Sequence, residues 1–450
     1  MHPLNFLRML PPGGAPLPLL AIARALADSF RPNSAFAALH ATLAKKFAQK
    51  HLFFTSSGRG ALALLFAAMH RANPDRNQIL LPAYLSFSVP SAVVRAGCRI
   101  ALYDVAPESL TPDMTSLKAA ISEQTLAVVA AHQFGLPFDL APMADLCREH
   151  GAFLVDDAAQ VMGATIEGKR AGASGDAGIF SLSRGKPICA VEGGILFTNN
   201  DGLADSIHAV MADSALANRL QLAKTNIYTV LAKAVALSLC RRPEIYKLPA
   251  SLPWLKIGES IFDPSFGLAD FTGFQASLAV QSYEKIESIN YQRLQKASTY
   301  IREIATIPLA RPIVVQAGAN PIYLRFPVIP ATDLFGEMFG EALRDAQAPK
   351  NFASLHEALA QTPAANLGLS PGFPLALCDI PELLPHVAPT RPCPGARFLA
   401  HNLITLPTHD QVLATDALRA VGCLKNALEA LHTVNASNHV QYKIFQGKPV

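Results

Sequence analysis

A regular alternation of strand-like and helical runs constrains the fold of this chain more than any other feature. Between Phe53 and about Asn200, short apolar runs such as NQILLPA and AFLVDD are each followed by a helical run such as SFSVPSAVVRAG or AAQVMGA. Nearly continuous apolar strands joined by helices are typical of a mostly parallel sheet that is buried on both faces. Ligands of such folds bind at the carboxyl ends of the strands, so the residues directly after each strand are the candidates for function.

The pattern along the chain predicts three parts. We expect an N-terminal helical segment over 1–50, a large domain over 51–290, and a smaller α+β domain over 291–450 whose strand-like runs include RPIVVQ and PIYLRFPVIP. Apolar residues recur at helical spacing through 273–304, which predicts one long helix there.

Composition excludes several classes of protein. The 450 residues carry 38 Lys and Arg against 34 Asp and Glu, a net charge of only +4, which argues against nucleic acid as a partner. The seven cysteines form no CxxC pair and have no histidine at metal-ligand spacing, which predicts reduced thiols, a cytoplasmic protein and no metal site. The N-terminus lacks the pattern of a signal peptide, and no apolar stretch reaches the roughly 18 residues of a membrane-spanning helix.

The turn at residues 55–62, TSSGRGAL, follows an apolar strand and opens an apolar helix. A turn of small residues at a helix N-terminus presents backbone N–H groups that suit a phosphate. The alternative is an ordinary capped helix start.

Asp156 and Asp157 end the apolar strand that begins AFLV. A buried carboxylate is unfavourable unless it is paired, and a protonated heterocyclic nitrogen is one suitable partner. The alternative is that both residues cap the following helix.

Lys186 lies in a polar loop between two apolar runs, FSLS and ILFTNN, with Arg184 close in sequence. Desolvation and a neighbouring cation lower the pKa of a lysine and make its amine nucleophilic. The alternative is a surface lysine, as most lysines are.

These motifs together supply the parts that hold pyridoxal 5'-phosphate (PLP): a phosphate site, a pyridinium partner and a reactive amine. Residues 55–62, DDAAQ at 156–160 and FSLSRGK at 180–186, followed by EGG, resemble the DegT/StrS family of sugar aminotransferases in order and spacing, and the resemblance covers about residues 45–430. It implies an α/β fold of the fold type I PLP enzymes, with a mostly parallel seven-stranded sheet, a smaller C-terminal domain and a homodimer.

The same resemblance assigns roles to residues. Lys186 would bond covalently to the cofactor and move the proton, Asp157 would pair with the pyridinium nitrogen, Gln160 would lie near the phenolic oxygen, and Ala159 would pack on the ring. The phosphate would be held by the backbone amides of Gly58 and Arg59 and by the Ser181 hydroxyl.

The chain departs from the family pattern near the cofactor ring and the phosphate. The ring-stacking aromatic falls on Ser86, for which Tyr84 or Phe87 would substitute, and Arg59 replaces a threonine. Two residues that make a cross-subunit contact in the family fall on Leu268 and Asp270.

A further departure lies in the segment that the resemblance assigns to substrate binding. There Phe352 replaces a tyrosine, four residues before His356.

Residues 220–262 form an insert that is longer and more apolar than the family's usual connection. Its first half is predicted to be helical and apolar almost all round, followed by Arg241, Arg242, Lys247 and Trp254. Because an all-round apolar helix is usually buried, we interpret the insert as a lid or dimer-packing element. The alternative is a peripheral membrane contact through 227–255.

The function that the resemblance implies is a PLP-dependent aminotransferase. It would move an amino group, with L-glutamate as donor, to a keto group of a nucleotide- or lipid-linked sugar for cell-surface polysaccharide or secondary-metabolite synthesis. The alternatives are a PLP-dependent dehydratase or lyase on the same scaffold, against which Lys186 argues because a histidine stands there in the family's dehydratases, and a scaffold protein without catalysis.

Overall fold

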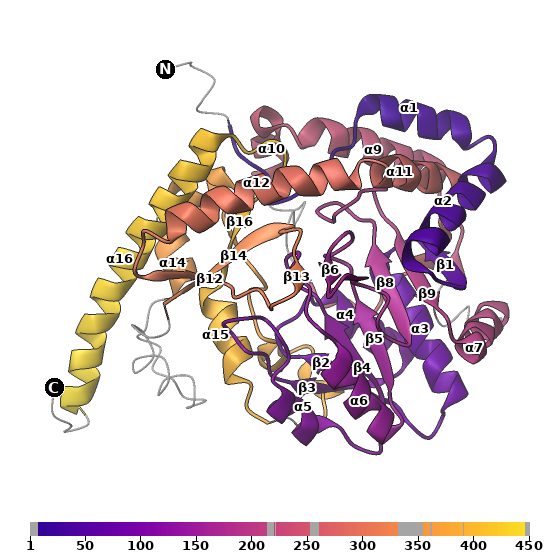
Figure 1. Cartoon of the computed structure of the whole chain (residues 1–450), viewed down its shortest axis with the longest axis horizontal. Coiled ribbons are helices and arrows are strands. Elements are labelled where there is room, and N and C mark those ends of the chain that lie inside the picture. The colour runs from indigo at the N-terminus through magenta and orange to yellow at the C-terminus, as the bar shows by residue number, and fades with distance from the viewer. Residues whose placement is uncertain are drawn as a thin grey trace.

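A central sheet and a smaller second sheet organise the molecule (Figure 1). The computed structural model describes residues 8–213, 220, 222–252, 261–331, 354–360, 362–389 and 391–445, and for 222 and 435–445 only the backbone. Phe352 and Trp254, both named from the sequence, lie outside the described residues.

The central sheet has seven strands in the order β1-β9-β8-β5-β4-β2-β3. Only β9 runs antiparallel to its neighbours in this sheet, so the predicted mostly parallel seven-stranded sheet is confirmed. Every residue of β4, β8 and β9 is buried, as a sheet covered on both faces requires. The strands are β1 (His51–Thr55), β2 (Gln78–Pro82), β3 (Arg99–Tyr103), β4 (Thr125–Ala131), β5 (Phe153–Asp157), β8 (Ala177–Ser181) and β9 (Gly194–Thr198).

Helices cover both faces of this sheet. The central helix of one face, α3, is buried from its first turn to Met69, and it packs between α4 and α7. The other face carries α5 and α6 over the β2–β5 half and α1, α2 and α11 over β8 and β9. These helices are α1 (Leu19–Asp28), α2 (Pro32–Phe47), α3 (Gly58–Ala72), α4 (Ser88–Ala96), α5 (Met114–Ala120), α6 (Ala141–His150), α7 (Asp201–Ala212) and α11 (Gly273–Tyr283).

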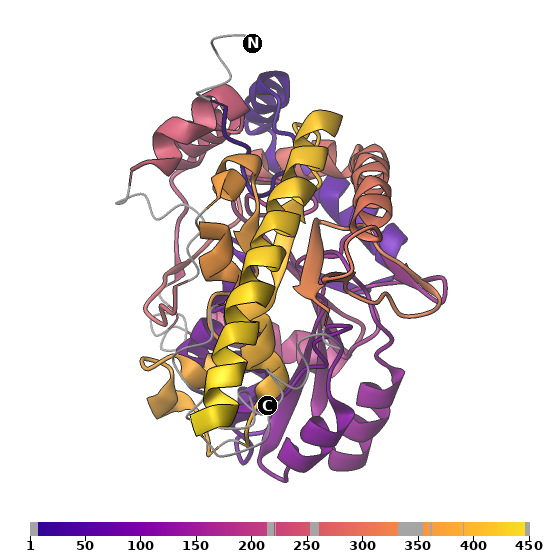
Figure 2. The same ribbon diagram turned by 90° about the vertical axis from the view of Figure 1, so that its left-hand side faces the viewer.

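The second sheet is antiparallel, with four strands in the order β12-β14-β16-β15. Its long helix α16 lies along one side of the molecule (Figure 2). The domain limits expected at residues 50 and 290 stay predictions. The elements here are β12 (Ala310–Pro312), β14 (Arg325–Pro330), β15 (Ser370–Pro371), β16 (Ile404–Pro407), α12 (Ile286–Ile304), α14 (Leu355–Ala360), α15 (Pro394–Asn402), α16 (Ala414–Phe445) and the 3-10 helices η3 (Pro363–Leu367), η4 (Leu377–Asp379) and η5 (Leu384–His386).

Short strand pairs complete the described structure. One small sheet joins two distant parts of the chain, because β13 pairs with β6 of the large sheet's region. The short strands are β6 (Thr165–Ile166), β7 (Lys169–Arg170), β10 (Leu222–Ala223), β11 (Leu268–Ala269) and β13 (Ala319–Asn320).

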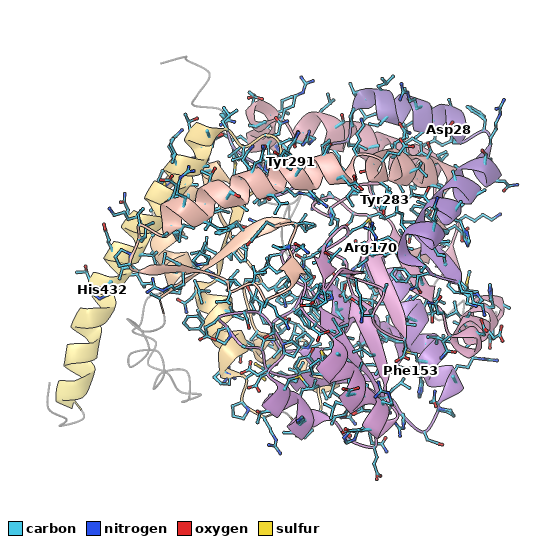
Figure 3. All side chains as sticks on the ribbon, viewed as in Figure 1. Asp28, Phe153, Arg170, Tyr283, Tyr291 and His432 are labelled. Atoms are coloured by element: carbon cyan, nitrogen blue, oxygen red, sulfur yellow. The ribbon has the colours of Figure 1, made fainter. Side chains whose placement is uncertain are left out.

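The single long helix predicted over 273–304 is wrong in one respect. The helical run breaks at Glu284 and Lys285, between Tyr283 at the end of α11 and Tyr291 on α12 (Figure 3). The two halves pack on different partners, since α11 contacts α1 and α2, whereas α12 contacts α16 and β12. The break separates two helices that pack on different parts of the molecule.

The predicted helix of the insert is α9 (Ile227–Cys240), which is followed by α10 (Pro243–Ala250). In this single chain α9 is not buried all round, because only Val230 and Ala234 are buried and side chains such as Tyr228 and Leu239 are exposed. No helix among the described residues is long and apolar enough to cross a membrane.

Candidate functional site

The carboxyl ends of the parallel strands bring several of the predicted residues together. The register pairs Ala131 at the end of β4 with Asp157 at the end of β5, and Asp157 with Ile179 of β8. The backbone N–H of His132, the residue after β4, donates to the Asp157 carbonyl at 3.1 Å. The residues that follow these strands therefore share one edge of the sheet, as the alternation in the sequence predicts.

Lys186 and Asp157 are electrostatic neighbours at this edge. Burial raises the pKa of Asp157, while the charges of Lys186 and His132 oppose that rise. Burial lowers the pKa of Lys186, and Asp157 opposes that fall. Among the described residues, Lys186 Nζ and Asp157 Oδ2 have no hydrogen-bond partner. A desolvated amine beside a carboxylate with an open oxygen is a reactive arrangement.

The cause of the lowered Lys186 pKa differs from the one expected. The sequence pointed to Arg184 as the neighbouring cation, but the Arg184 side chain is exposed and the pKa of the half-buried Lys186 falls because its amine is desolvated. This environment differs from that of an ordinary exposed surface lysine.

The two adjacent carboxylates have different tasks, because successive residues of a strand point to opposite faces. Asp156 is fully buried, and its Oδ2 accepts from the N–H groups of Gly172 at 2.9 Å and Ser174 at 3.1 Å. Its Oδ1 lies 3.1 Å from His132 Nε2. Asp157 Oδ1 accepts from Ala159 N–H at 3.1 Å. The alternative in which both residues cap one helix is therefore wrong, because Asp156 holds the loop at Gly172 and Ser174 in place.

The turn at residues 55–62 forms a cradle at the start of α3. Ser57 caps the helix by accepting from Gly60 N–H at 3.1 Å, whereas no described residue accepts from the N–H groups of Gly58 and Arg59. A Cβ on Gly58 would lie 2.9 Å from Ser181 Cβ, so only glycine lets the turn approach that serine so closely. Two open N–H groups beside a hydroxyl fit a phosphate.

The Arg59 side chain points away from a direct phosphate role. Its Nη1 lies 3.4 Å from Asp263 Oδ2, and its Cζ lies 4.3 Å from the centre of the Phe266 ring. Burial lowers the pKa of Arg59, and Asp263 opposes this. The guanidinium thus holds the segment at Asp263 and Phe266 in place. Arg59 can contribute to a phosphate site through its backbone N–H.

Gln160 and Ala159 are half-buried at the same edge. Gln160 Oε1 accepts from Phe134 N–H at 3.0 Å, which fixes the loop after β4. That loop also holds Gln133, which sequence reasoning missed: its Nε2 donates to the Tyr84 carbonyl at 2.5 Å, and its buried Oε1 has no partner. The signal was its place directly after the strand in TLAVVAAHQF.

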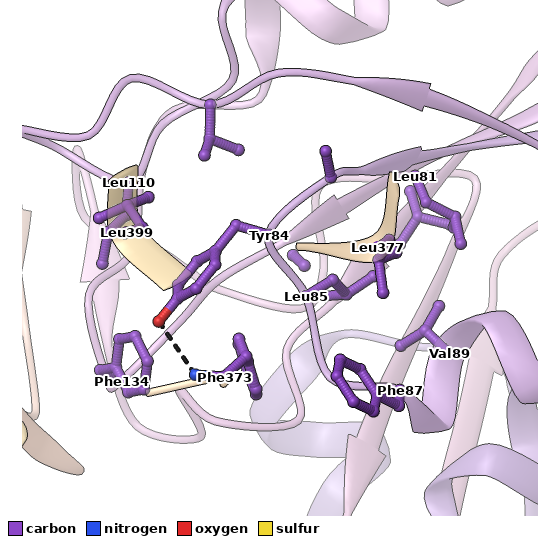
Figure 4. Close-up of a cluster of buried hydrophobic side chains, with 14 of the residues drawn as sticks. Leu81, Tyr84, Leu85, Phe87, Val89, Leu110, Phe134, Phe373, Leu377 and Leu399 are labelled. Carbon is purple, nitrogen blue, oxygen red and sulfur yellow. Dashed lines mark hydrogen bonds between the residues drawn. The ribbon is translucent and has the colours of Figure 1, made fainter. Parts of the chain in front are cut away.

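Tyr84 and Phe87, the proposed substitutes for a ring-stacking aromatic, both lie in a buried apolar cluster (Figure 4). The Tyr84 hydroxyl accepts from Phe373 N–H at 3.0 Å, and burial raises the pKa of that phenol. Ser86, between them, is half-buried with its Oγ 3.3 Å from Ser88 Oγ. A substrate role for Tyr84 or Phe87 stays a prediction.

His356 belongs to the second sheet's surroundings. Its Nε2 lies 3.0 Å from the Leu403 carbonyl, and burial lowers its pKa. This contact is structural, so the substrate role of His356 also stays a prediction.

Comparison with known proteins extends these observations. The family model described as the DegT/DnrJ/EryC1/StrS aminotransferase family matches residues 25–232. A GDP-perosamine synthase from Vibrio cholerae is 31% identical over 156 residues, which are 35% of this chain and 42% of that protein. The chain therefore spans about two fifths of the length of the curated relatives that it matches.

Solved structures agree with the fold over almost the whole chain. PseC of Helicobacter pylori, an aminotransferase involved in the biosynthesis of pseudoaminic acid, has a TM-score of 0.68 at 16% identity and covers 94% of this chain and all of its own. The E. coli GDP-4-keto-6-deoxy-D-mannose-3-dehydratase with bound hydrated PLP has a TM-score of 0.65 at 16% identity over 92% of this chain and 99% of its own. The fold is therefore that of fold type I PLP enzymes. Over residues 25–232, this chain is similar to the DegT/DnrJ/EryC1/StrS aminotransferase family.

Proposed function

We propose that this chain is a PLP-dependent aminotransferase that moves an amino group from L-glutamate to a keto group of a nucleotide- or lipid-linked sugar. The observation that carries the proposal is the half-buried, desolvated amine of Lys186, which interacts electrostatically with the buried Asp157 at the carboxyl edge of the sheet. The names of relatives, among them an L-glutamine:scyllo-inosose aminotransferase from Streptomyces griseus, support this class of reaction.

The residues present fit PLP. The open N–H groups of Gly58 and Arg59 and the Ser181 hydroxyl would hold its phosphate, and Asp157 Oδ2 would accept from its ring nitrogen. When bound, this cofactor supplies an electron sink that stabilises negative charge on the substrate carbon.

The side chains around the ring have separate tasks in this proposal. Asp157 keeps the ring nitrogen protonated by its negative charge, and Asp156 keeps the loop at Gly172 in place. Lys186, whose lowered pKa leaves more of its amine uncharged near neutral pH, takes the proton from the substrate carbon and returns it. Ala159 leaves room for the ring, and Gln160 orients the loop beside it.

Two expectations about assembly and location belong to this proposal. We propose that the protein is cytoplasmic and that it forms a homodimer. The homodimer is supported by apolar side chains that are exposed on the neighbouring helices α1 and α9, such as Leu20 and Tyr228. A face of this kind is typical of contact with a partner. The competing hypothesis, in which 227–255 touches a membrane surface, predicts that the protein sediments with anionic liposomes at low salt.

A half-reaction experiment tests the proposed activity. PLP-loaded protein mixed with glutamate should lose the absorbance of the bound aldehyde form and release 2-oxoglutarate, because the amino group passes to the cofactor. A keto-sugar acceptor should then restore the original spectrum. Absence of 2-oxoglutarate would show that glutamate is not the donor, and loss of water from the sugar without amino transfer would favour the dehydratase.

A further inference from the structure

The insert, residues 220–262, contacts both the region of the central sheet and the region of the second sheet. At one end, Lys233 of α9 forms an ion pair with Glu192, in the segment before β9. At the other end, Arg241 forms an ion pair with Asp410, just after β16 of the second sheet. The Pro243 carbonyl accepts from Met9 N–H at 2.8 Å. The start of α10 is therefore held in a fixed position between both regions.

This position places Tyr246 of α10 near two arginines. Burial raises the pKa of the half-buried Tyr246, and the charges of Arg184 and Arg325 oppose that rise. Arg184 precedes Lys186 by two residues, and Arg325 begins β14. One phenol of the insert thus lies within electrostatic reach of the Lys186 loop and of the second sheet.

The start of β14 is fastened to the carboxyl edge of the central sheet. Ile322 N–H donates to the Gly135 carbonyl at 2.9 Å, and Arg325 N–H donates to the Phe134 carbonyl at 3.3 Å. Gly135 has φ of +89°, and a Cβ there would lie 2.3 Å from Leu324 N, so the approach requires glycine. Arg325 is consequently held beside the edge that carries Gln133 and Asp157.

Among the described residues, the guanidinium of Arg325 forms hydrogen bonds but has no carboxylate partner. Its Nη2 donates to Ser370 Oγ at 2.6 Å and to the Thr405 and Gly368 carbonyls at 3.3 and 3.4 Å, while its buried Nε has no partner. Burial lowers its pKa to about 10, and the opposing charges come from the phenols of Tyr246 and Tyr84.

Two other arginines in this part of the described structure form ion pairs with carboxylates. Arg397 binds Asp379 through two nitrogens, and Arg241 pairs with Asp410. The buried Arg293 makes no ion pair among the described residues, but it has the charge of Asp410 nearby. A desolvated cation without an anion is unfavourable, and the half-buried Arg325 has no counter-ion among the described residues, so a bound ligand can supply one.

We propose that Arg325, Tyr246 and Arg184 bind an oxyanion of the substrate at the mouth of the Lys186 site, with Tyr246 supplied by the insert. Two guanidinium groups and a phenol offer the donors that carboxylate and phosphate oxygens accept. The assignment of a substrate rests on the proposed aminotransfer, and the oxyanion belongs either to the amino-acid donor or to the sugar's phosphate.

Binding of inert anions tests this site without catalysis. Glutarate, which has two carboxylates and neither an amino nor a keto group, and inorganic pyrophosphate are titrated calorimetrically into PLP-loaded protein. We expect at least one to bind, about tenfold or more weaker in Arg325→Met and a few-fold weaker in Tyr246→Phe, because charge-assisted hydrogen bonds are lost. The exposed Arg302→Met serves as the matched control and should bind like the wild type.

Each outcome bears on the proposal. Binding of glutarate that glutamate competes away assigns the subsite to the donor, whereas binding of pyrophosphate alone assigns it to the acceptor. No binding of either probe, or equal affinity in wild type and Arg325→Met, overturns the proposal. If Arg325→Met does not fold, unchanged affinity in folded Tyr246→Phe overturns it. Failure of glutamate to donate its amino group would leave probe binding intact, which separates the two failures.

Discussion

Two parts of the site are built in different ways. We call the carboxyl edge of the central sheet, with Asp157 and Lys186, the inner edge, and we call the proposed oxyanion site around Arg325 the mouth. The inner edge is formed where strands of one sheet end: Gly58 follows β1, Asp157 ends β5, and Lys186 lies in the loop after β8. The mouth joins Arg184, Tyr246 and Arg325, which come from a loop, an inserted helix and the second sheet. The inner edge is thus set by strand ends within one sheet, whereas the mouth depends on how separate parts of the chain pack together.

The largest effect is expected from the inner edge. Lys186→Ala should reduce the rate of amino transfer at least about a thousandfold, because the group that bonds the cofactor and moves the proton is removed. The absorbance of bound cofactor should change at the same time. Lys169→Ala, which removes an exposed lysine, is the control. Normal turnover in Lys186→Ala would refute the role of this residue.

A comparison of Asp157→Asn with Asp156→Ala separates chemistry from structure. Asp157→Asn should fold normally but lose about a hundredfold or more in rate, since a neutral amide no longer keeps the ring nitrogen protonated. Asp156→Ala should lower the free energy of unfolding by about 2 kcal/mol, because the buried Gly172 N–H and the Ser174 N–H lose their acceptor. Urea unfolding and single-turnover rates measure the two effects. If Asp157→Asn were as unstable as Asp156→Ala, the division of tasks would be wrong.

A smaller effect should appear at His409, which precedes Asp410, the ion-pair partner of Arg241 in the insert. His409 Nε2 lies 2.8 Å from the Pro11 carbonyl, and His409 Nδ1 accepts from Gln411 N–H at 3.3 Å, which indicates a neutral ring. Burial lowers the pKa of His409 to about 4, with Asp410 opposing and Arg241 and Arg293 adding to this fall.

The lowered pKa of His409 sets the direction in which the free energy of unfolding changes with pH. Between pH of about 6.5 and 4 the unfolded chain binds a proton at His409 that the folded chain does not, so stability is lost as the pH falls through this window. The loss should be about 1–3 kcal/mol in the free energy of unfolding, and it should shrink in His409→Gln. The exposed His401→Gln is the control and should keep the full slope. An identical slope in His409→Gln would show that other groups cause it.

Prediction from the sequence was most successful where the position of a residue follows from local order. Lys186, Asp157 and the turn at Gly58 are each recognisable next to an apolar strand, and one sheet collects them. It failed where partners are distant: Asp156 is distinguished from Asp157 by its contacts with Gly172, Ser174 and His132. Likewise, the break between α11 and α12 follows from two different packing partners.

By itself, the sequence determined the mostly parallel sheet, the edge at which its loops meet and the residues that line that edge. Periodic apolar runs and strand-end motifs are local, and a parallel sheet converts them directly into position. Only the tertiary structure decided that α9 lies on the surface and that Tyr246 and Arg325 approach the site. Contacts between segments some 80 residues apart, such as these two, depend on how whole elements pack, and no local pattern encodes that packing.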